Sequence, residues 1–200
     1  MGQVIDMNIY LKRMKVVKMC EILKKIQFKT ASNLLKEYNI KNEPPVNISL
    51  LLENIGISLI AKDFSEIERI SGCKKDSILG AAISNNDNLA IFYRADDTYH
   101  RKIFTIAHEL GHCCIHADNL KIEHIEYRTI NVMDKHEIEA NIFAGELLIP
   151  YSILKSVYDD FIIPSLKSLS KIFDVSTNVM AARLDYLNLG YYKDVDISEE

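Results

Sequence analysis

Residues 101–112 read RKIFTIAHELGH, and this stretch carries a histidine-bearing polar stripe through an otherwise apolar segment. On an α-helix, positions three, four, seven and eleven apart lie on one face. The remaining positions of the stretch are largely apolar, so the helix is expected to be buried. Buried polar groups require partners, and a metal ion would serve several of them at once. The stripe consists of Thr105, His108, Glu109, His112 and His116.

The motif His108-Glu109-x-x-His112 has the spacing of a catalytic zinc site. Because His108 and His112 are four residues apart on one helix face, both imidazoles can bind one cation. Glu109 lies beside that cation without being forced to bind it. Zinc lowers the pKa of a bound water from about 15.7 to about 7. The motif therefore predicts Zn²⁺ as cofactor, His108 and His112 as ligands, and Glu109 as the catalytic general base.

A catalytic zinc ion usually has three protein ligands, so a further ligand is sought on the next predicted helix, residues 135–148. Glu139 is favoured, because apolar neighbours such as Ala140 predict that it is buried, and a buried carboxylate must be paired or metal-bound. Glu137 is about 200° around the helix from Glu139, so only one of them can face the metal. Glu146 shares the face of Glu139 and is a candidate partner for a metal-bound histidine.

Other polar residues near the motif are weaker candidates. His116 is one turn further along the helix, which favours an outer or capping role over direct binding. Cys113 and Cys114 follow His112 but are turned toward the core, as free cysteines commonly are. A donor that stabilises the oxyanion is also required. The candidates for that role are His124, Tyr127, Arg128 and His136.

The hydrophobic pattern predicts an α+β fold with helical segments at both ends. A helix is expected over 9–38, and Pro44-Pro45 marks a boundary. A short helix follows, capped by Asn47 or Ser49 and ending at Gly56. The strands 57–60, 78–84 and 89–93 suggest a small, mostly antiparallel sheet, in which the last two form a hairpin. Further expected elements are a helix over 97–116, a loop over 117–134 and helices over 135–148, 165–173 and 176–187.

These boundaries divide the chain into an N-terminal helical segment (1–44), a catalytic core (45–150) and a helical C-terminal region (151–200). The 200 residues carry 24 basic and 28 acidic side chains, a net charge of −4, which gives no general attraction to nucleic acid. The four cysteines form no C-x-x-C pair or disulfide framework, which indicates a reducing, cytoplasmic setting. No apolar run approaches the roughly 20 residues of a membrane span.

Both motif regions resemble the signatures of the ImmA/IrrE-like zinc metallopeptidases. Residues 101–112 look like the first signature, and residues 137–150, EIEANIFAGELLIP, resemble the second, with similar order and separation. The resemblance covers roughly 45–190. It implies a small sheet packed on a helical, zincin-like catalytic core, with His108, His112 and Glu139 as zinc ligands and Glu109 as general base. Arg94 departs from the asparagine expected there.

The same resemblance implies a zinc metallo-endopeptidase, a hydrolase that cleaves helix-turn-helix repressors in mobile elements or stress responses. The expected partner is thus a protein substrate, with no direct nucleic-acid or membrane partner. One alternative is a DNA-binding regulator, because residues 166–184 resemble a helix-turn-helix. Its second helix, however, offers only Arg183 for phosphates, so it is interpreted as part of the fold or a surface for the repressor. Another alternative is a zinc-binding sensor without peptidase activity.

Overall fold

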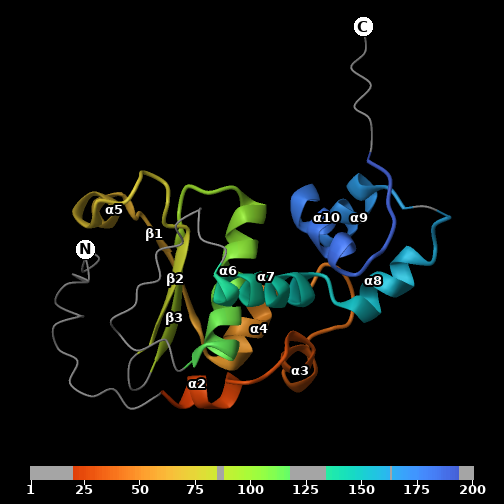
Figure 1. Ribbon diagram of the computed structural model, residues 1–200. Helices are drawn as coiled ribbons and strands as arrows, with labels where there is room; N and C mark the ends of the chain where they lie inside the picture. The colour runs from red at the N-terminus through yellow and green to blue at the C-terminus, as the bar shows by residue number, and fades with distance from the viewer. Residues whose placement is uncertain (1–19, 85–87, 118–133, 163, 194–200) are drawn as a thin grey trace, which may run out of the picture.

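The computed structural model describes residues 20–84, 88–117, 134–162 and 164–193. Within these ranges a three-stranded sheet lies beside a group of helices, and α6 runs between the sheet and α7 (Figure 1). No helix of the described ranges combines the length and apolar character needed to cross a membrane. The elements are α2 (Glu21–Ile26), α3 (Ala31–Glu37), α4 (Ile48–Ile55), β1 (Ser58–Lys62), α5 (Ser65–Ser71), β2 (Gly80–Ser84), β3 (Leu89–Arg94), α6 (Tyr99–Ile115), α7 (Lys135–Leu148), α8 (Tyr151–Tyr158), α9 (Leu166–Phe173) and α10 (Thr177–Tyr186).

The α+β class is confirmed, and the sheet is mixed. The strand order is β1-β3-β2, with β2 and β3 antiparallel and β1 parallel to β3. The predicted hairpin is therefore correct, although its turn at 85–87 lies outside the described residues. Parallel strands need a long connection between them, and α5 and β2 lie between β1 and β3 in the chain.

The N-terminal region differs from the single helix expected over 9–38. Within the described residues it forms two short helices, α2 and α3, separated by Phe28 in the left-handed conformation (φ 63°). The backbone N–H of Phe28 donates to the carbonyl of Cys114 at 2.6 Å, and the Thr30 hydroxyl caps α3 by accepting from Asn33. The chain therefore does not continue as one helix through Phe28, because the N–H groups of Phe28 and Asn33 are hydrogen-bonded to acceptors outside a continuous helix. Residues 1–19 lie outside the described ranges.

Other helix ends agree with the capping residues of the sequence. The Asn47 side chain caps α4, and Gly56 ends it at φ 91°. Ser165 and Ser176 cap α9 and α10. The sequence did not predict α5, a seven-residue helix with no side-chain N-cap. A helix of seven residues whose N-cap residue forms no side-chain hydrogen bond leaves little local signal in the sequence.

Arg94, the residue that departs from the expected family pattern, anchors the end of β3. Arg94 is 3% exposed, and its guanidinium pairs with the buried carboxylate of Glu68 on α5. Nη1 lies 3.2 Å from Asp76, and Nε donates to the carbonyl of Ile78 at 2.9 Å. Burying an unpaired guanidinium would be costly, so these acceptors are what allow arginine at this position.

A single hydrophobic cluster spans the fold and receives residues from all three predicted segments. It contains Cys20 and Leu34 before the proline pair, Ile91 and Leu110 in the centre, and Leu184 on α10. All three predicted segments therefore contribute side chains to one shared core. The domain boundaries at residues 44 and 150 stay predictions. Such a core holds α6 and α7 in a fixed relation, which is the requirement for a metal site built from both.

Candidate metal centre

His108 and His112 lie on consecutive turns of α6, in the part of the helix that is buried. Their exposed fractions are 1% and 5%. The Nε2 atoms of the two rings are 2.9 Å apart, and the ring centroids are 4.7 Å apart. The four-residue spacing therefore gives the shared helix face that the sequence predicts. Two buried imidazoles with their Nε2 atoms directed at one point form two sides of a potential cation site.

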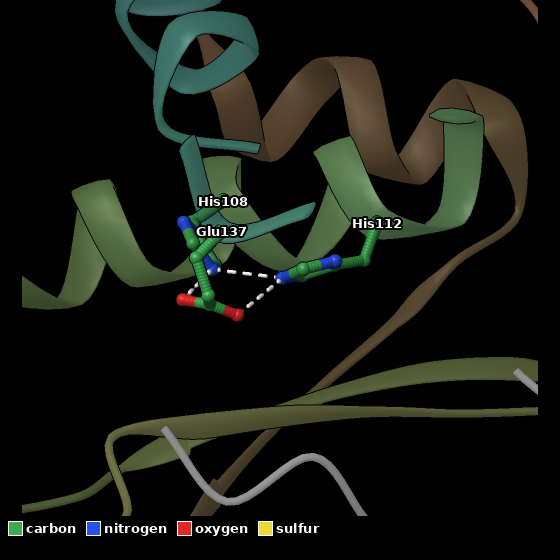
Figure 2. Close-up of side chains that lie close together, drawn as sticks. All are labelled: His108, His112 and Glu137. Carbon is green, nitrogen blue, oxygen red and sulfur yellow. Dashed lines mark hydrogen bonds and ion pairs between the residues drawn. The ribbon is translucent and has the colours of Figure 1, made fainter. Parts of the chain in front are cut away.

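Glu137, in the first turn of α7, completes the group. Its Oε2 is 3.3 Å from His108 Nε2, and its Oε1 is 3.1 Å from His112 Nε2. Figure 2 shows the three side chains reaching toward one another, two from α6 and one from α7. Among the described residues, these three form the only group of histidine, cysteine and acidic side chains with potential ligand atoms all within 4.8 Å of one another.

Glu139 does not occupy the place that the sequence analysis gave it. Its Oε2 is 2.9 Å from His116 Nε2, and its Oε1 is 3.6 Å from the Lys135 ammonium. The side chain is one-third exposed, so the expectation of a buried carboxylate is wrong. As expected, only one of Glu137 and Glu139 faces the two histidines, but the one that does so is Glu137. The neighbours Ala140 and Phe143 are buried, yet their face of α7 is not the face of Glu139.

A signal for Glu137 was available in the sequence. Glu137 and Asn141 are four positions apart, so they share a helix face, and both are polar. In the structure Asn141 Oδ1 lies 2.9 Å from Nδ1 of His108. Glu137 thus supplies a candidate ligand, and Asn141 holds the ring of a second candidate ligand, His108.

Both histidines have a partner at the ring nitrogen that points away from the group. Nδ1 of His108 lies 2.9 Å from Asn141 Oδ1, so in the metal-bound state Nδ1–H would donate to Asn141 and the lone pair of Nε2 would be available to the cation. Nδ1 of His112 is 3.1 Å from Nδ1 of His116, and the other nitrogen of His116 is held by Glu139. His116 thus has the outer role expected for it and also forms the C-cap of α6. These contacts fix the orientation of each ring.

The electrostatics of the group agree with this arrangement. Hydrogen bonds with His108 and His112, together with the charge of the two rings, hold the pKa of Glu137 well below its usual range. Hydrogen bonding to His116 also lowers the pKa of Glu139. Glu137 is therefore ionised at neutral pH, which is the state a carboxylate needs to bind a cation.

Glu109 is 8% exposed and follows His108 on α6. Its side chain lies against β2, where a Cβ built at Gly80 would be 3.2 Å from Glu109 Cγ and 2.5 Å from Thr105 Cγ2. Gly80 therefore allows the strand to approach the polar face of α6 closely. Glu109 is therefore buried where α6 packs against β2.

The remaining candidates have other surroundings. Burial raises the pKa of Cys114 to about 12 and that of Cys113 well above its ordinary value, so neither thiol is a ready thiolate ligand. Glu146, which was expected to support a metal-bound histidine, pairs with Arg183 on α10. The partners at Nδ1 of His108 and His112 are Asn141 and His116. The ring of His136 packs against that of His116 in a tilted arrangement, with centroids 4.5 Å apart and an interplanar angle of 58°. His124, Tyr127 and Arg128 lie outside the described residues.

The donor set of the three-residue group fits a zinc ion. Two imidazole nitrogens and one carboxylate form a set known from catalytic zinc sites. Nitrogen ligands about 2.0 Å from a tetrahedral ion are about 3.3 Å from each other. The separations between ligand atoms here, 2.9 Å, 3.1 Å and 3.3 Å, are close to that value. His108, His112 and Glu137 would hold the ion, with Asn141 and His116 behind the two rings.

Comparison with known proteins agrees with the geometry. The chain is 43% identical over 49 residues to an uncharacterized immunity region protein 2 of Bacillus phage phi105, a stretch covering 24% of this chain and 30% of the phage protein. The match spans less than a third of that relative. The profile of the IrrE N-terminal-like domain, a peptidase domain, matches residues 55–185, which is more than half of the chain and includes α6 and α7. The chain therefore belongs to the ImmA/IrrE family.

Proposed function

We propose that this protein is a zinc-dependent endopeptidase whose substrate is a helix-turn-helix transcriptional repressor. The observation that carries the proposal is the convergence of His108, His112 and Glu137 within a buried pair of helices. A purely structural cluster would not need two histidines with their Nε2 atoms 2.9 Å apart. A cation between the rings would be bound by both Nε2 lone pairs and by the Glu137 carboxylate at once, which a hydrogen bond between the two rings alone does not achieve.

Each residue has a definable role in peptide hydrolysis. When bound, zinc supplies a Lewis acid and a water molecule that is more acidic than bulk water. Glu109 accepts a proton from the attacking water and delivers it to the amine that leaves when the C–N bond breaks. Asn141 and His116 keep the histidine rings oriented. The bond consumed is one amide, and the products are a carboxylate and an amine.

A repressor as substrate is supported by family membership and by the name of the phage relative. That relative is described as a protein of a phage immunity region. A peptidase acting there would remove a DNA-bound regulator and not degrade protein generally. The net charge of −4 also fits a protein that acts on other proteins better than one that binds DNA.

The geometry of α10 disfavours DNA binding as the main function. Arg183, the basic residue that a recognition helix would offer, is 4% exposed. It pairs with Glu146, and its Nε donates to the carbonyl of Ile149 at 3.1 Å. A guanidinium used in this way to attach α10 to α7 is not available to a phosphate. We therefore interpret α9 and α10 as part of the peptidase fold.

The deciding experiment compares wild type, Glu109→Gln and Glu137→Gln after zinc loading. Each is incubated with helix-turn-helix proteins of the same genome, beginning with any that is encoded beside this gene, and the products are identified by intact-mass spectrometry. We expect one discrete cut by wild type. Glu109→Gln should bind zinc normally but lose at least about a hundredfold in rate, because general-base catalysis contributes roughly that much. Glu137→Gln should lose both zinc and activity.

Two results would contradict the proposal. If Glu109→Gln cuts as fast as wild type, the cleavage arises elsewhere. If zinc binds to wild type but neither the neighbouring repressor nor any other helix-turn-helix protein of the same genome is cut, the metal-sensor alternative replaces the peptidase. An electrophoretic titration with duplex DNA at two salt concentrations tests the alternative of a DNA-binding regulator. That alternative predicts tight, sequence-dependent binding.

A further inference from the structure

A line of hydrogen-bonding groups leads from His112 toward the protein surface. Nδ1 of His112 lies 3.1 Å from Nδ1 of His116, and Nε2 of His116 lies 2.9 Å from Oε2 of Glu139. His112 and His116 are 5% and 8% exposed, whereas the Glu139 side chain is one-third exposed. A ring N–H that is buried without an acceptor is costly, so these contacts constrain where the protons of the two rings can lie.

The proton positions along this line are determined once Nε2 of His112 binds a cation. A neutral imidazole that gives the lone pair of Nε2 to a metal carries its proton on Nδ1. The Nδ1–H of His112 is then directed at Nδ1 of His116, which must accept it with a lone pair. The proton of His116 is consequently on Nε2, from which it is donated to the Glu139 carboxylate.

The opposite tautomer of His116 would oppose metal binding. It places an N–H of His116 against the N–H of His112, and it turns a ring lone pair toward the Glu139 carboxylate. Both contacts are unfavourable, whereas an N–H that donates to a carboxylate forms a strong hydrogen bond. Glu139 therefore favours the tautomer of His116 that can support His112. The other histidine of the pair, His108, has a simpler support in the side chain of Asn141.

The ring of His116 is held in place by packing and by its own backbone. Its centroid is 5.3 Å from that of His112 and 4.5 Å from that of His136. The backbone N–H of His116 donates to the carbonyl of His112 at 2.9 Å, where His116 forms the C-cap of α6. The ring is thus already positioned to accept from His112, as a preorganised metal centre requires.

We propose that His116 is a positioning residue that sets the tautomer of His112, and that Glu139 in turn sets the tautomer of His116. A carboxylate that does not contact the metal thereby makes the Nε2 lone pair of His112 available to it. Loss of such an outer partner weakens metal binding by roughly 10–100-fold. The inference rests on the proposed function only for the zinc ion at the metal centre, and it does not require that a peptide bond is cleaved.

The tautomers can be measured in the zinc-loaded wild type near neutral pH. Protein labelled isotopically at the histidine nitrogens gives long-range proton–nitrogen NMR spectra, in which protonated, lone-pair and metal-bound nitrogens differ in chemical shift. The signals of His116 are assigned by their loss in His116→Asn. We expect the proton of His116 on Nε2 and that of His112 on Nδ1. A proton on Nδ1 of His116 would overturn the proposal, whereas a purely structural role would not require either tautomer.

Zinc affinity, measured by competition with a chromophoric chelator, tests the same contact in two variants of similar shape. His116→Leu removes the acceptor and should weaken zinc binding by roughly 10–100-fold. His116→Asn keeps a side-chain oxygen close to the place of Nδ1, so it should recover most of that loss. His100→Leu is the matched control, because it removes an exposed histidine of the same helix whose partner is Asp174, and it should bind zinc as wild type does.

The outcomes separate this inference from the proposed function. Wild-type zinc affinity in His116→Leu, or equal losses in His116→Leu and His116→Asn, would overturn the role of His116 as an acceptor and leave the metal centre intact. If zinc does not bind the wild type, the metal centre and both proposals fail. Circular dichroism of the metal-free variants checks their folding. If His116→Leu does not fold, the tautomer of His116 in wild type still decides the question.

Discussion

Glu137 and Glu139 lie two positions apart on α7, yet they contact different histidines. Glu137 reaches both His108 and His112, whereas Glu139 reaches His116. Successive residues of a helix are about 100° apart, so a separation of two positions turns a side chain to almost the opposite face. One carboxylate is therefore placed to bind the metal, and the other acts only through the ring that supports His112.

Zinc affinity should distinguish the two carboxylates. We expect Glu137→Gln to weaken zinc binding by at least a hundredfold, because it removes a direct ligand. Glu139→Gln should weaken it less than about tenfold, because two intervening rings and partial exposure dilute its influence. Dissociation constants from competition with a chromophoric chelator provide the measurement. Equal losses in the two variants, or a larger loss in Glu139→Gln, would restore Glu139 as the ligand.

The histidine pair could be predicted from sequence because its spacing lies within one helix. The third ligand could not be predicted in the same way, because it depends on how α7 is rotated against α6. Burial was inferred for Glu139 from Ala140 and Phe143, but those residues face the core while Glu139 faces His116. The shared face of Glu137 and Asn141 was the more reliable signal, since it requires only the helical repeat.

At the scale of elements, the contact between α6 and α7 determines the geometry of the centre. Gly111 lies where the two helices approach most closely. A Cβ built at this position would be 3.2 Å from the carbonyl oxygen of Ala140 and 3.2 Å from Cβ of Phe143. The absence of a side chain in one helix thus brings His108 and His112 within reach of Glu137 on the other.

Gly111→Ala should weaken the metal centre even though alanine favours helix formation. The added methyl group must separate α6 from α7 by a few tenths of an ångström, so we expect zinc affinity to fall severalfold. Gly145→Ala is the matched control on α7, because its new Cβ meets only one atom, at 3.7 Å, and gains up to about 1 kcal/mol of helix propensity. Chelator competition and thermal unfolding of both variants check this. A Gly111→Ala protein with wild-type zinc affinity would contradict the role of the close contact.

The elements with strong local signals were predicted well, and those set by tertiary contacts were not. The bounds of α7 and the Asn47 cap of α4 agree with the sequence, because each depends on residues within the same segment. The break at Phe28 and the parallel pairing of β1 depend on partners far along the chain, namely Cys114 and β3. Contacts between residues far apart in the chain cannot be predicted from a short stretch of sequence.

For the whole molecule, two buried arginines hold the outer parts of the fold against the centre. Arg183 attaches α10 to α7 through its ion pair with Glu146. Arg94 attaches the sheet to α5 through Glu68. Removing one partner of a buried ion pair leaves an uncompensated charge in the core. The packing of α10 on α7 and of α5 on the sheet therefore depends on single side chains.

The Arg94–Glu68 pair should make the stability of the metal-free protein depend on pH in a predictable direction. Burial alone would raise the pKa of Glu68, but backbone N–H groups of Ile78 and Asp76 and the Arg94 guanidinium together lower it below its ordinary value of 4.5. A carboxylate with a lowered pKa in the folded state stabilises the protein fully above that ordinary value. This stabilisation is lost as the pH falls toward the folded pKa, because the unfolded chain binds the proton first.

Urea unfolding of chelator-treated protein between about pH 7 and about pH 4 measures this effect. Near neutral pH we expect Glu68→Gln to lower the free energy of unfolding by on the order of 3 kcal/mol, since Arg94 loses its buried counter-charge. The difference between Glu68→Gln and wild type should shrink as the pH falls, because wild type then loses the same carboxylate charge. Glu66→Gln, an exposed change on the same helix, should follow the wild-type curve throughout. A constant difference between Glu68→Gln and wild type across the whole range would mean that Glu68 acts by packing and not by its charge.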